Sequence, residues 1–329
     1  MERKRIRTGI AAALAILVLV LDGQTGLDGA KEGLELCIRS VIPSLFPFFV
    51  LGILLTGNLW GCDIPILRPL GQVFGLSDGG ESLLLTSFLG GYPVGAQSVA
   101  NAWRQRMICK PDAERLLGFC NNSGPSFLFG IIGPMFPDSS IPWLLWGIHI
   151  FSAWVVSMVI PRSYGKMRLD QTSATSLPQA LQRSLHVMAS VCGWIILFRV
   201  GIAFLNRWIL WFLTPAGQTI IVGLLELANG CFHLPKIPDE NMRIILCSGM
   251  LGFGGICVAM QTASVTEGLS LRYYFPGKIL QGSVSMLIAW IFFPAGYLTP
   301  LLLCPIILIS AISLRKLEKR SGNRVTVGV

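Results

Sequence analysis

Charged residues are scarce in this chain of 329 residues, since Asp, Glu, Lys and Arg together make up only 13% of it. An ordinary soluble domain carries about 25%. Hydrophobic residues make up 53%, and the mean hydropathy is +0.64. The chain has too few charged groups to face water, which excludes a soluble globular protein and indicates a single integral membrane domain in a lipid bilayer.

Sequence signals for catalysis and metal binding are also lacking. The apolar spans contain no HExxH, no GxSxG and no paired carboxylates, and the chain has no Walker A sequence, so neither a hydrolase nor an ATP-driven pump is supported. Nine cysteines are scattered without a CxxC pair or a neighbouring His cluster, which suggests neither a zinc site nor a disulfide framework. We therefore expect no enzyme activity and no cofactor.

Basic residues outnumber acidic ones by 26 to 17, which gives a net charge of +9. In a membrane protein such an excess usually lies in cytoplasmic loops, so we do not take it as a sign of nucleic-acid binding. The segments assigned to the cytoplasm are 1–7, 104–115, the loop 162–183 and the tail 315–320. Segments 22–35 and 137–140 suit the outside.

About eight apolar runs approach the length of about 20 helical residues that a bilayer core requires. They lie at 6–21, 36–60, 113–136, 141–160, 184–205, 208–230, 277–296 and 298–314. The first run follows a basic segment and could be a signal peptide. No clear small-x-small cleavage site follows Leu21, so we favour an uncleaved helix.

Two further apolar segments, 82–100 and 244–265, are each interrupted by a glycine pair, Gly90–Gly91 and Gly254–Gly255. Broken backbone at membrane depth is tolerated only where protein or a water-filled cavity covers it, so re-entrant hairpins are the natural interpretation. The alternative is an ordinary spanning helix with a glycine packing face. We predict an all-α membrane protein with about eight transmembrane helices and two re-entrant helical hairpins.

The chain also matches itself, which predicts two internal repeats. PLGQ at 69–72 recurs as PAGQ at 215–218. The pair Gly90–Gly91, followed by Gln97 and Ser98, recurs as Gly254–Gly255, followed by Gln261 and Thr262. A weaker match relates Phe49 and Gly52 to Phe198 and Gly201. The predicted division is 1–35 (basic segment, first helix and external loop), 36–161 (first repeat), 162–183 (basic loop), 184–314 (second repeat) and 315–329 (basic tail). Four spans between the hairpins imply parallel repeats, whereas inverted repeats would need 208–230 not to cross, and this choice stays open.

The most polar stretch inside an apolar run comprises Asn121, Asn122, Ser123, Gly124 and Pro125. Pro125 removes a backbone donor, and Gly124 and the two Asn residues disfavour helix, so the helix should unwind there. Transporters build substrate sites from such breaks. We expect residues 121–123 to face a water-filled cavity; the alternative is a kinked helix whose polar side chains bond only to neighbouring helices.

Glu226, in the apolar sequence LLELANG, is the best candidate for a functional charge within the membrane. A carboxylate in an apolar run is costly and commonly serves as a proton or cation relay. It could equally form a structural ion pair with Arg199, and Asn229 lies one helical turn further along. We therefore assign Glu226, Arg199 and Asn229 to coupling or to an ion pair.

The sequences GGYPVGAQ (90–97), PDAERLLGFCNNSGPSFLFGIIG (111–133), VIPSLFPFFV (41–50) and LLELANG (224–230) resemble the sporulation integral membrane proteins of the YlbJ type, which carry the nucleoside-recognition or Gate domain. The resemblance covers about 36–296 and is most specific in the first half. It implies a spore-forming Firmicute, a place in the bacterial cell membrane, specifically the mother-cell membrane around the forespore, and a link to moving dipicolinic acid. The related Gate domain of concentrative nucleoside carriers has two re-entrant hairpins and broken helices. The family usually has Lys where this chain has Gln97, which weakens the case for a dicarboxylate.

The leading hypothesis is a transporter of a small metabolite, namely dipicolinate or a related anionic or heterocyclic compound. The alternatives are a nucleoside-type carrier and a non-transporting structural or signalling protein of the spore envelope. Homo-oligomers and spore membrane protein partners stay open. The predicted substrate-binding residues are Gly90, Gly91, Pro93, Gly95, Gln97, Asn121, Asn122, Ser123, Gly124, Pro125, Gly254, Gly255, Gln261 and Thr262.

Overall fold

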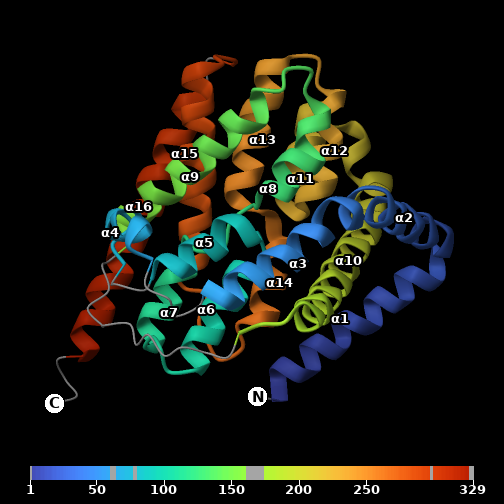
Figure 1. Cartoon of the computed structure of the whole chain (residues 1–329). Coiled ribbons are helices and arrows are strands. Elements are labelled where there is room, and N and C mark those ends of the chain that lie inside the picture. The colour runs from blue at the N-terminus through green and yellow to red at the C-terminus, as the bar shows by residue number, and fades with distance from the viewer. Residues whose placement is uncertain (1, 60–63, 77–79, 161–173, 297–298, 326–329) are drawn as a thin grey trace.

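The computed structural model describes residues 2–59, 64–76, 80–160, 174–296 and 299–325. These residues form helices and connecting turns without any strand, which confirms the all-α class (Figure 1). Most of the basic loop 162–183 and the end of the tail lie outside the described residues.

Sixteen α-helices follow one another along the described part of the chain. They are α1 (Glu2–Leu21), α2 (Gly23–Leu36), α3 (Ile42–Leu59), α4 (Arg68–Val73), α5 (Glu81–Gly90), α6 (Val94–Arg104), α7 (Lys110–Leu116), α8 (Pro125–Phe127), α9 (Ile141–Val159), α10 (Leu177–Trp208), α11 (Pro215–Leu225), α12 (Leu227–His233), α13 (Glu240–Phe253), α14 (Gly255–Val265), α15 (Tyr274–Phe292) and α16 (Thr299–Val325). Short π-helical turns at Cys37–Val41 and Leu128–Ile132 and 3-10 turns at Pro65–Leu67, Gly133–Met135, Leu210–Phe212 and Leu234–Lys236 extend or connect them.

Six helical stretches in the described part of the chain are long and apolar enough to cross a membrane. They are Gly23–Leu59, Ile141–Val159, Leu177–Trp208, Glu240–Val265, Tyr274–Phe292 and Thr299–Leu317. Two of the predicted spans are not continuous helices. Residues 113–136 are divided by a non-helical segment before Pro125, and residues 208–230 are divided at Glu226, where the backbone is extended.

α5 and α6 form a helical hairpin that turns at Gly91–Pro93. The two helices lie so close that a Cβ on Gly95 of α6 would come within 3.2 Å of the Ser87 Cα of α5. Gly91 has a φ of +70°, a conformation that favours glycine because it has no Cβ. The first glycine-interrupted segment therefore folds back on itself as a helical hairpin.

The second hairpin is formed by α11 and α12 and turns at Glu226, not at the second glycine pair. Gly223 and Gly230 face each other across it, since a Cβ on Gly230 would lie 2.8 Å from the Gly223 nitrogen. Small residues at matching distances from the turn allow two helix backbones to approach this closely. The predicted span 208–230 is therefore a hairpin.

The segment with the second glycine pair was predicted as a hairpin, but α14 continues below α13 in Figure 1. The two helices make one apolar run of 26 residues, Glu240–Val265, broken at its middle. Gly254 and Gly255 have φ values of +83° and +82°, which interrupt the helix. A glycine pair predicts such a break correctly, but it does not determine whether the chain reverses there.

The predicted external loop 22–35 is also helical. The Asp22 side chain accepts the Thr25 N–H at 3.4 Å and caps α2, and Gly26, Gly29 and Gly33 lie against α10. A Cβ on Gly29 would lie 3.0 Å from the Val200 Cα. The glycine spacing makes one smooth helical face, so α2 packs on α10 although it carries three acidic residues.

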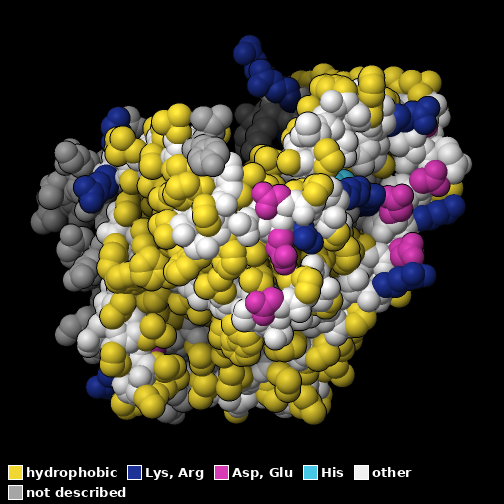
Figure 2. All heavy atoms as spheres, turned by 90° about the horizontal axis from the view of Figure 1, so that it is seen from above, with side chains coloured by type: hydrophobic (Ala, Val, Ile, Leu, Met, Phe, Trp, Pro, Cys, Tyr) yellow, Lys and Arg dark blue, Asp and Glu magenta, His cyan; other side chains and the backbone are white. Residues whose placement is uncertain are grey.

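The two ends of the molecule differ in charge. The N-terminus, the C-terminus, α6 and α7 lie at the lower end in Figure 1, which we call the inner end because its basic residues were predicted to face the cytoplasm. Figure 2 views the opposite, outer end, where charged side chains gather on the right, at the place of α2 in Figure 1. Acidic side chains also lie near the middle of this face, and hydrophobic side chains cover much of the rest of it.

Candidate functional site

Four interruptions of helical structure meet inside the protein, and we call their meeting point the central junction. It consists of the α5–α6 turn (91–93), the unwound segment 120–124, the α11–α12 turn at Glu226 and the α13–α14 break (254–255). A Cβ on Gly91 would lie 3.1 Å from the Gly124 nitrogen, and one on Gly255 would lie 3.1 Å from the Gly223 carbonyl oxygen. The Tyr92 hydroxyl donates to the Leu251 carbonyl at 3.4 Å and bonds the Ser123 hydroxyl.

The unwound segment is held by hydrogen bonds from several helices. Asn121 accepts the Ala96 N–H at 3.3 Å and donates to the Thr262 hydroxyl at 2.8 Å. Asn122 donates to the Ser87 hydroxyl at 2.8 Å. The Ser123 N–H donates to His149 Nε2 at 3.1 Å. Buried polar groups need such partners, because an unpaired group costs about 1–3 kcal/mol.

These contacts correct one expectation. Asn121, Asn122 and Ser123 have no exposed surface in this conformation, and their side chains bond to protein groups. They do not face a water-filled cavity here. The segment unwinds as predicted, but its polar side chains join α5, α6, α9 and α14 at the central junction.

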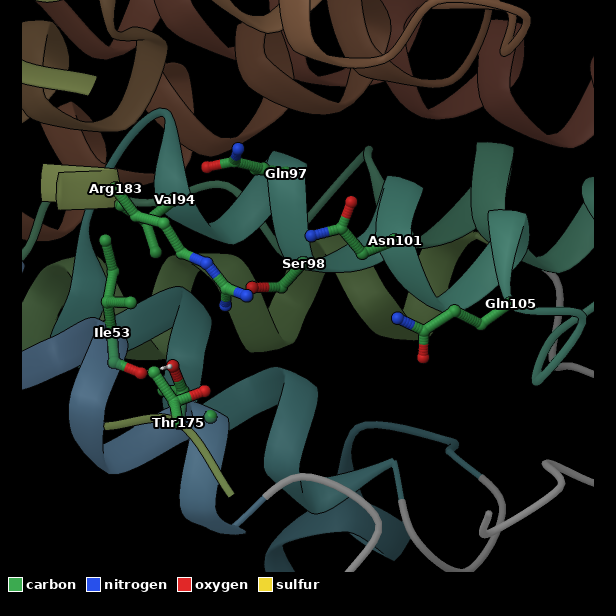
Figure 3. Close-up of a pocket in the computed structure, with 10 residues that line it drawn as sticks. Ile53, Val94, Gln97, Ser98, Asn101, Gln105, Thr175 and Arg183 are labelled. Atoms are coloured by element: carbon green, nitrogen blue, oxygen red, sulfur yellow. Dashed lines mark hydrogen bonds between the residues drawn. The ribbon is translucent and has the colours of Figure 1, made fainter. Parts of the chain in front are cut away.

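A polar cavity of about 570 Å³ opens at the inner end, and we call it the inner cavity. Figure 3 shows Gln97, Ser98 and Asn101 on α6, Gln105 directly after it, and the Arg183 side chain of α10 extending towards Ser98. Its other lining residues are Ile53, Thr56 and Gly57 of α3, together with Val94 and Thr175. Gln97, one of the predicted binding residues, therefore lines this cavity.

Two smaller cavities lie further along the same helices. The central cavity, about 30 Å³, is lined by Val41, Leu45, Tyr92, Phe127, Val191, Ile195, Glu226, Leu227, Ala228, Val258 and Gln261. The outer cavity, about 260 Å³, is lined by Glu32, Leu36, Arg199, Asn229, Phe232, His233 and Lys236. Thus Gln261 and Glu226 line the central cavity, and Arg199 and Asn229 line the outer one.

The three cavities follow one another in opposite order along two helices. On α10, Arg183 lines the inner cavity, Val191 and Ile195 the central cavity, and Arg199 the outer cavity. At 1.5 Å per residue, Arg183 and Arg199 lie about 24 Å apart along the helix axis, close to the thickness of a bilayer core.

The α2–α3 stretch lines the same cavities in reverse. Leu36 lines the outer cavity, Leu45 the central cavity and Ile53 the inner one. The two helices that carry the weakly matching Phe49 and Phe198 thus run antiparallel, as inverted repeats require.

Glu226 caps a helix in the structure. Its carboxylate accepts the backbone N–H groups of Ala228 at 3.1 Å and of Asn229 at 2.7 Å, and the Asn229 side-chain amide at 2.6 Å. Arg199 forms an ion pair with Glu32 of α2, so the pair with Glu226 is not made in this conformation. Sequence spacing could not reveal Glu32 as the partner, because α2 was not expected to be a helix that packs on α10.

The remaining predicted site residues surround the central junction. Gly90 packs on Val94, Gly95 lies against the Cys120 carbonyl, and Thr262 accepts from Asn121. Pro93 is the N-cap residue of α6, and Pro125 is the first residue of α8. The structure thus brings both repeat motifs and the unwound segment to one place.

Sequence reasoning missed several polar residues of this region. Lys278 and Gln281 of α15 are fully buried and bond to Asn122. The sequence did contain a sign of them, because a Lys and a Gln stand three residues apart in an apolar run. Residues at this spacing lie on the same face of a helix. Asn101 and Gln105 follow Gln97 at four-residue intervals, so the polar face of α6 was also visible in the sequence.

The chain is similar to a known sporulation protein over most of its length. The sporulation integral membrane protein YlbJ of Bacillus subtilis (strain 168) is 26% identical over 88% of this chain and 84% of its own length. No family model and no solved structure matches the chain. The chain is thus an integral membrane protein, and this similarity over most of both sequences supports its membership of the YlbJ-type family of sporulation membrane proteins.

Proposed function

We propose that this protein transports a small metabolite across the membrane, along the line of the inner, central and outer cavities. The observation that carries the proposal is the order of these cavities along α3 and α10, with the α5–α6 turn and the α11–α12 turn both contributing to the central one. Opposed hairpins around a narrow centre suit alternating access, in which one side opens while the other is closed.

The proposed topology has eight crossings. Six are the long apolar helices, and the other two are α1 and the broken segment from Lys110 to Met135. The α5–α6 and α11–α12 hairpins then enter from opposite sides without crossing. Three crossings separate them, so the repeats are inverted, and both termini lie in the cytoplasm, in agreement with their basic residues.

The inner cavity favours a small heterocyclic substrate that carries carboxylates, such as dipicolinate. Arg183 supplies a guanidinium, which binds carboxylates in a two-point geometry. Gln97, Asn101 and Gln105 add amides that can donate to a carboxylate or accept from a ring N–H group. Arg183 would then supply the positive charge that the family usually provides through Lys at position 97.

A neutral heterocycle, such as a nucleoside, is the second candidate. The Glu226 carboxylate lines the central cavity, and a dianion passing that point would be repelled unless the carboxylate were neutralised. A nucleoside meets no such repulsion, and the amides of α6 suit a nucleobase edge.

Uptake by liposomes that contain the purified protein tests the proposal. Labelled dipicolinate and labelled nucleosides are offered separately, with protein-free liposomes as the control. Saturable uptake of dipicolinate supports the first substrate, and saturable uptake of a nucleoside supports the second. A folded protein that takes up neither would favour a structural or signalling role in the spore envelope.

Arg183→Gln is expected to raise the apparent KM for dipicolinate about tenfold, because a hydrogen bond to a charged group contributes about 1.5–3 kcal/mol. Arg39→Gln is the matched control, since Arg39 is an exposed arginine that pairs with Glu35 and lines none of the three cavities. An unchanged KM in Arg183→Gln would remove the inner cavity from the substrate path.

A further inference from the structure

Lys278 is a buried lysine whose side-chain nitrogen is held by two neutral amides. Its side chain, near the start of α15, has no exposed surface. The ammonium group donates to the Gln281 side-chain oxygen at 2.8 Å and to the Asn122 side-chain oxygen at 3.3 Å. No carboxylate lies within ion-pair distance of it among the described residues. Because a buried charge costs several kcal/mol unless it is compensated, such a lysine needs an explanation.

The surroundings of this ammonium form a site suited to a cation. Gln281 also donates to the Asn122 oxygen at 3.0 Å, so the two side-chain amides hold each other with their oxygens towards Lys278. Asn122 belongs to the unwound segment 120–124, which follows α7. A Cβ on Gly277 would lie 2.5 Å from the Gly118 carbonyl oxygen, so the first turn of α15 packs directly on the C-terminal end of α7. The C-terminal end of a helix carries partial negative charge and favours a cation.

In transporters with broken helices, a bound Na⁺ commonly occupies this kind of place, among amide or carbonyl oxygens at the C-terminal end of a half-helix. We infer that the Lys278 ammonium is a tethered cation that takes the position of a bound alkali ion and holds the unwound segment 120–124 against α15. The protein is therefore stable without sodium. A corollary that rests on the proposed function is that substrate uptake does not require Na⁺.

Thermal unfolding of the purified full-length protein tests this inference without any transport measurement. The melting temperature of the wild type is measured in NaCl, KCl and N-methyl-D-glucamine chloride at equal ionic strength, and these values should agree within about 1 °C. A higher melting temperature in NaCl that saturates with Na⁺ concentration would overturn the inference. This comparison needs no variant, so it holds even if substitutions at Lys278 prevent folding.

Variants at Lys278 separate a cation site from ordinary packing. Lys278→Ala removes the ammonium and leaves a space beside the two amide oxygens, so its melting temperature should fall by about 5 °C or more. Methylammonium chloride should restore much of this loss in a saturable manner, whereas N-methyl-D-glucamine should not. Lys278→Met should lose similar stability without being restored, because its side chain fills the space.

Lys31→Ala, which removes an exposed lysine of α2, is the control and should match the wild type. A Lys278→Met protein with the melting temperature of the wild type would contradict the inference, as would a folded Lys278→Ala protein that methylammonium does not stabilise. Uptake measured in sodium-free medium then tests the corollary. Absence of all uptake would count against the proposed function but leave the melting data intact.

Discussion

Gly91→Val should abolish transport, because two separate constraints at this position exclude a side chain. The φ of +70° is a conformation in which a β-branched residue is strongly disfavoured. In addition, a Cβ would lie 3.1 Å from the Gly124 nitrogen and 3.3 Å from its Cα, and backbone atoms cannot move aside as a flexible side chain can. The α5–α6 turn would have to separate from the unwound segment, which opens the central junction. Initial uptake rates in liposomes should fall at least about 100-fold, in keeping with the loss of placement at a binding site.

The control for this variant is Gly147→Val. Gly147 lies in α9, where a Cβ would meet no atom of the described residues within 4 Å, so Val fits there with little effect on transport. Gly255→Val, at a φ of +82°, should resemble Gly91→Val because it pushes α14 away from the Gly223 carbonyl. Comparable uptake by Gly91→Val and Gly147→Val at equal protein content would show that the contact between residues 91 and 124 is not needed for function.

Glu226→Ala should lower the stability of the protein by about 3–5 kcal/mol, since it removes a helix cap and leaves buried donors unpaired. The backbone N–H groups of Ala228 and Asn229 both depend on this carboxylate. Arg199→Met should cost much less, because Arg199 pairs with Glu32, which is half exposed. The measurement is thermal melting of Glu226→Ala, Glu226→Gln, Arg199→Met and the double variant that combines Glu226→Gln with Arg199→Met.

The double variant decides between a cap and an ion pair. If Glu226 acts as the α12 cap, the double variant should lose as much stability as Glu226→Gln and, in addition, the small amount lost in Arg199→Met. If Glu226 and Arg199 were instead a buried pair, the double variant would be more stable than Glu226→Gln alone, since no uncompensated charge would remain. A Glu226→Gln protein with normal stability but without pH-dependent uptake would instead identify Glu226 as a proton relay.

The breaks in this fold could be predicted from local sequence, because glycine, proline and asparagine act on their own backbone. The unwound stretch before Pro125 and the turn at Gly91 are such cases. The reversal at Glu226 was less visible, because 208–230 is apolar enough for a span. Its signs were a carboxylate three residues before Asn229, which is the spacing of a helix cap, and glycines at 223 and 230 on either side of it.

The inverted arrangement proposed for the repeats depends on the same correction. When 208–230 is counted as a span, four spans separate the two predicted hairpins and the repeats are parallel. When this span alone is left out of the count, the basic C-terminal tail falls on the outside. In the proposed topology two changes remove this conflict: α11–α12 is a hairpin that does not cross, and the Glu240–Val265 run, which is long enough to span a membrane, crosses instead. Charge and topology then agree.

Long-range partners could not be read from the sequence. Asn122 was recognised as unusual, but its bond to Lys278 spans 156 residues. The Arg199–Glu32 pair spans 167 residues. Such contacts depend on how the helices pack, which the local pattern of a single sequence does not specify.

The inner and outer cavities should be the two ends of one substrate path if the protein is a transporter. Asn101→Cys in the inner cavity and Lys236→Cys in the outer cavity test this most directly, with a membrane-impermeant thiol reagent applied to either side of sealed vesicles and the parent protein as background. Asn101→Cys should react only from the cytoplasmic side and Lys236→Cys only from the outside, and substrate should slow both reactions. Reaction of both cysteines from the same side, or substrate protection at neither, would contradict a path between the cavities.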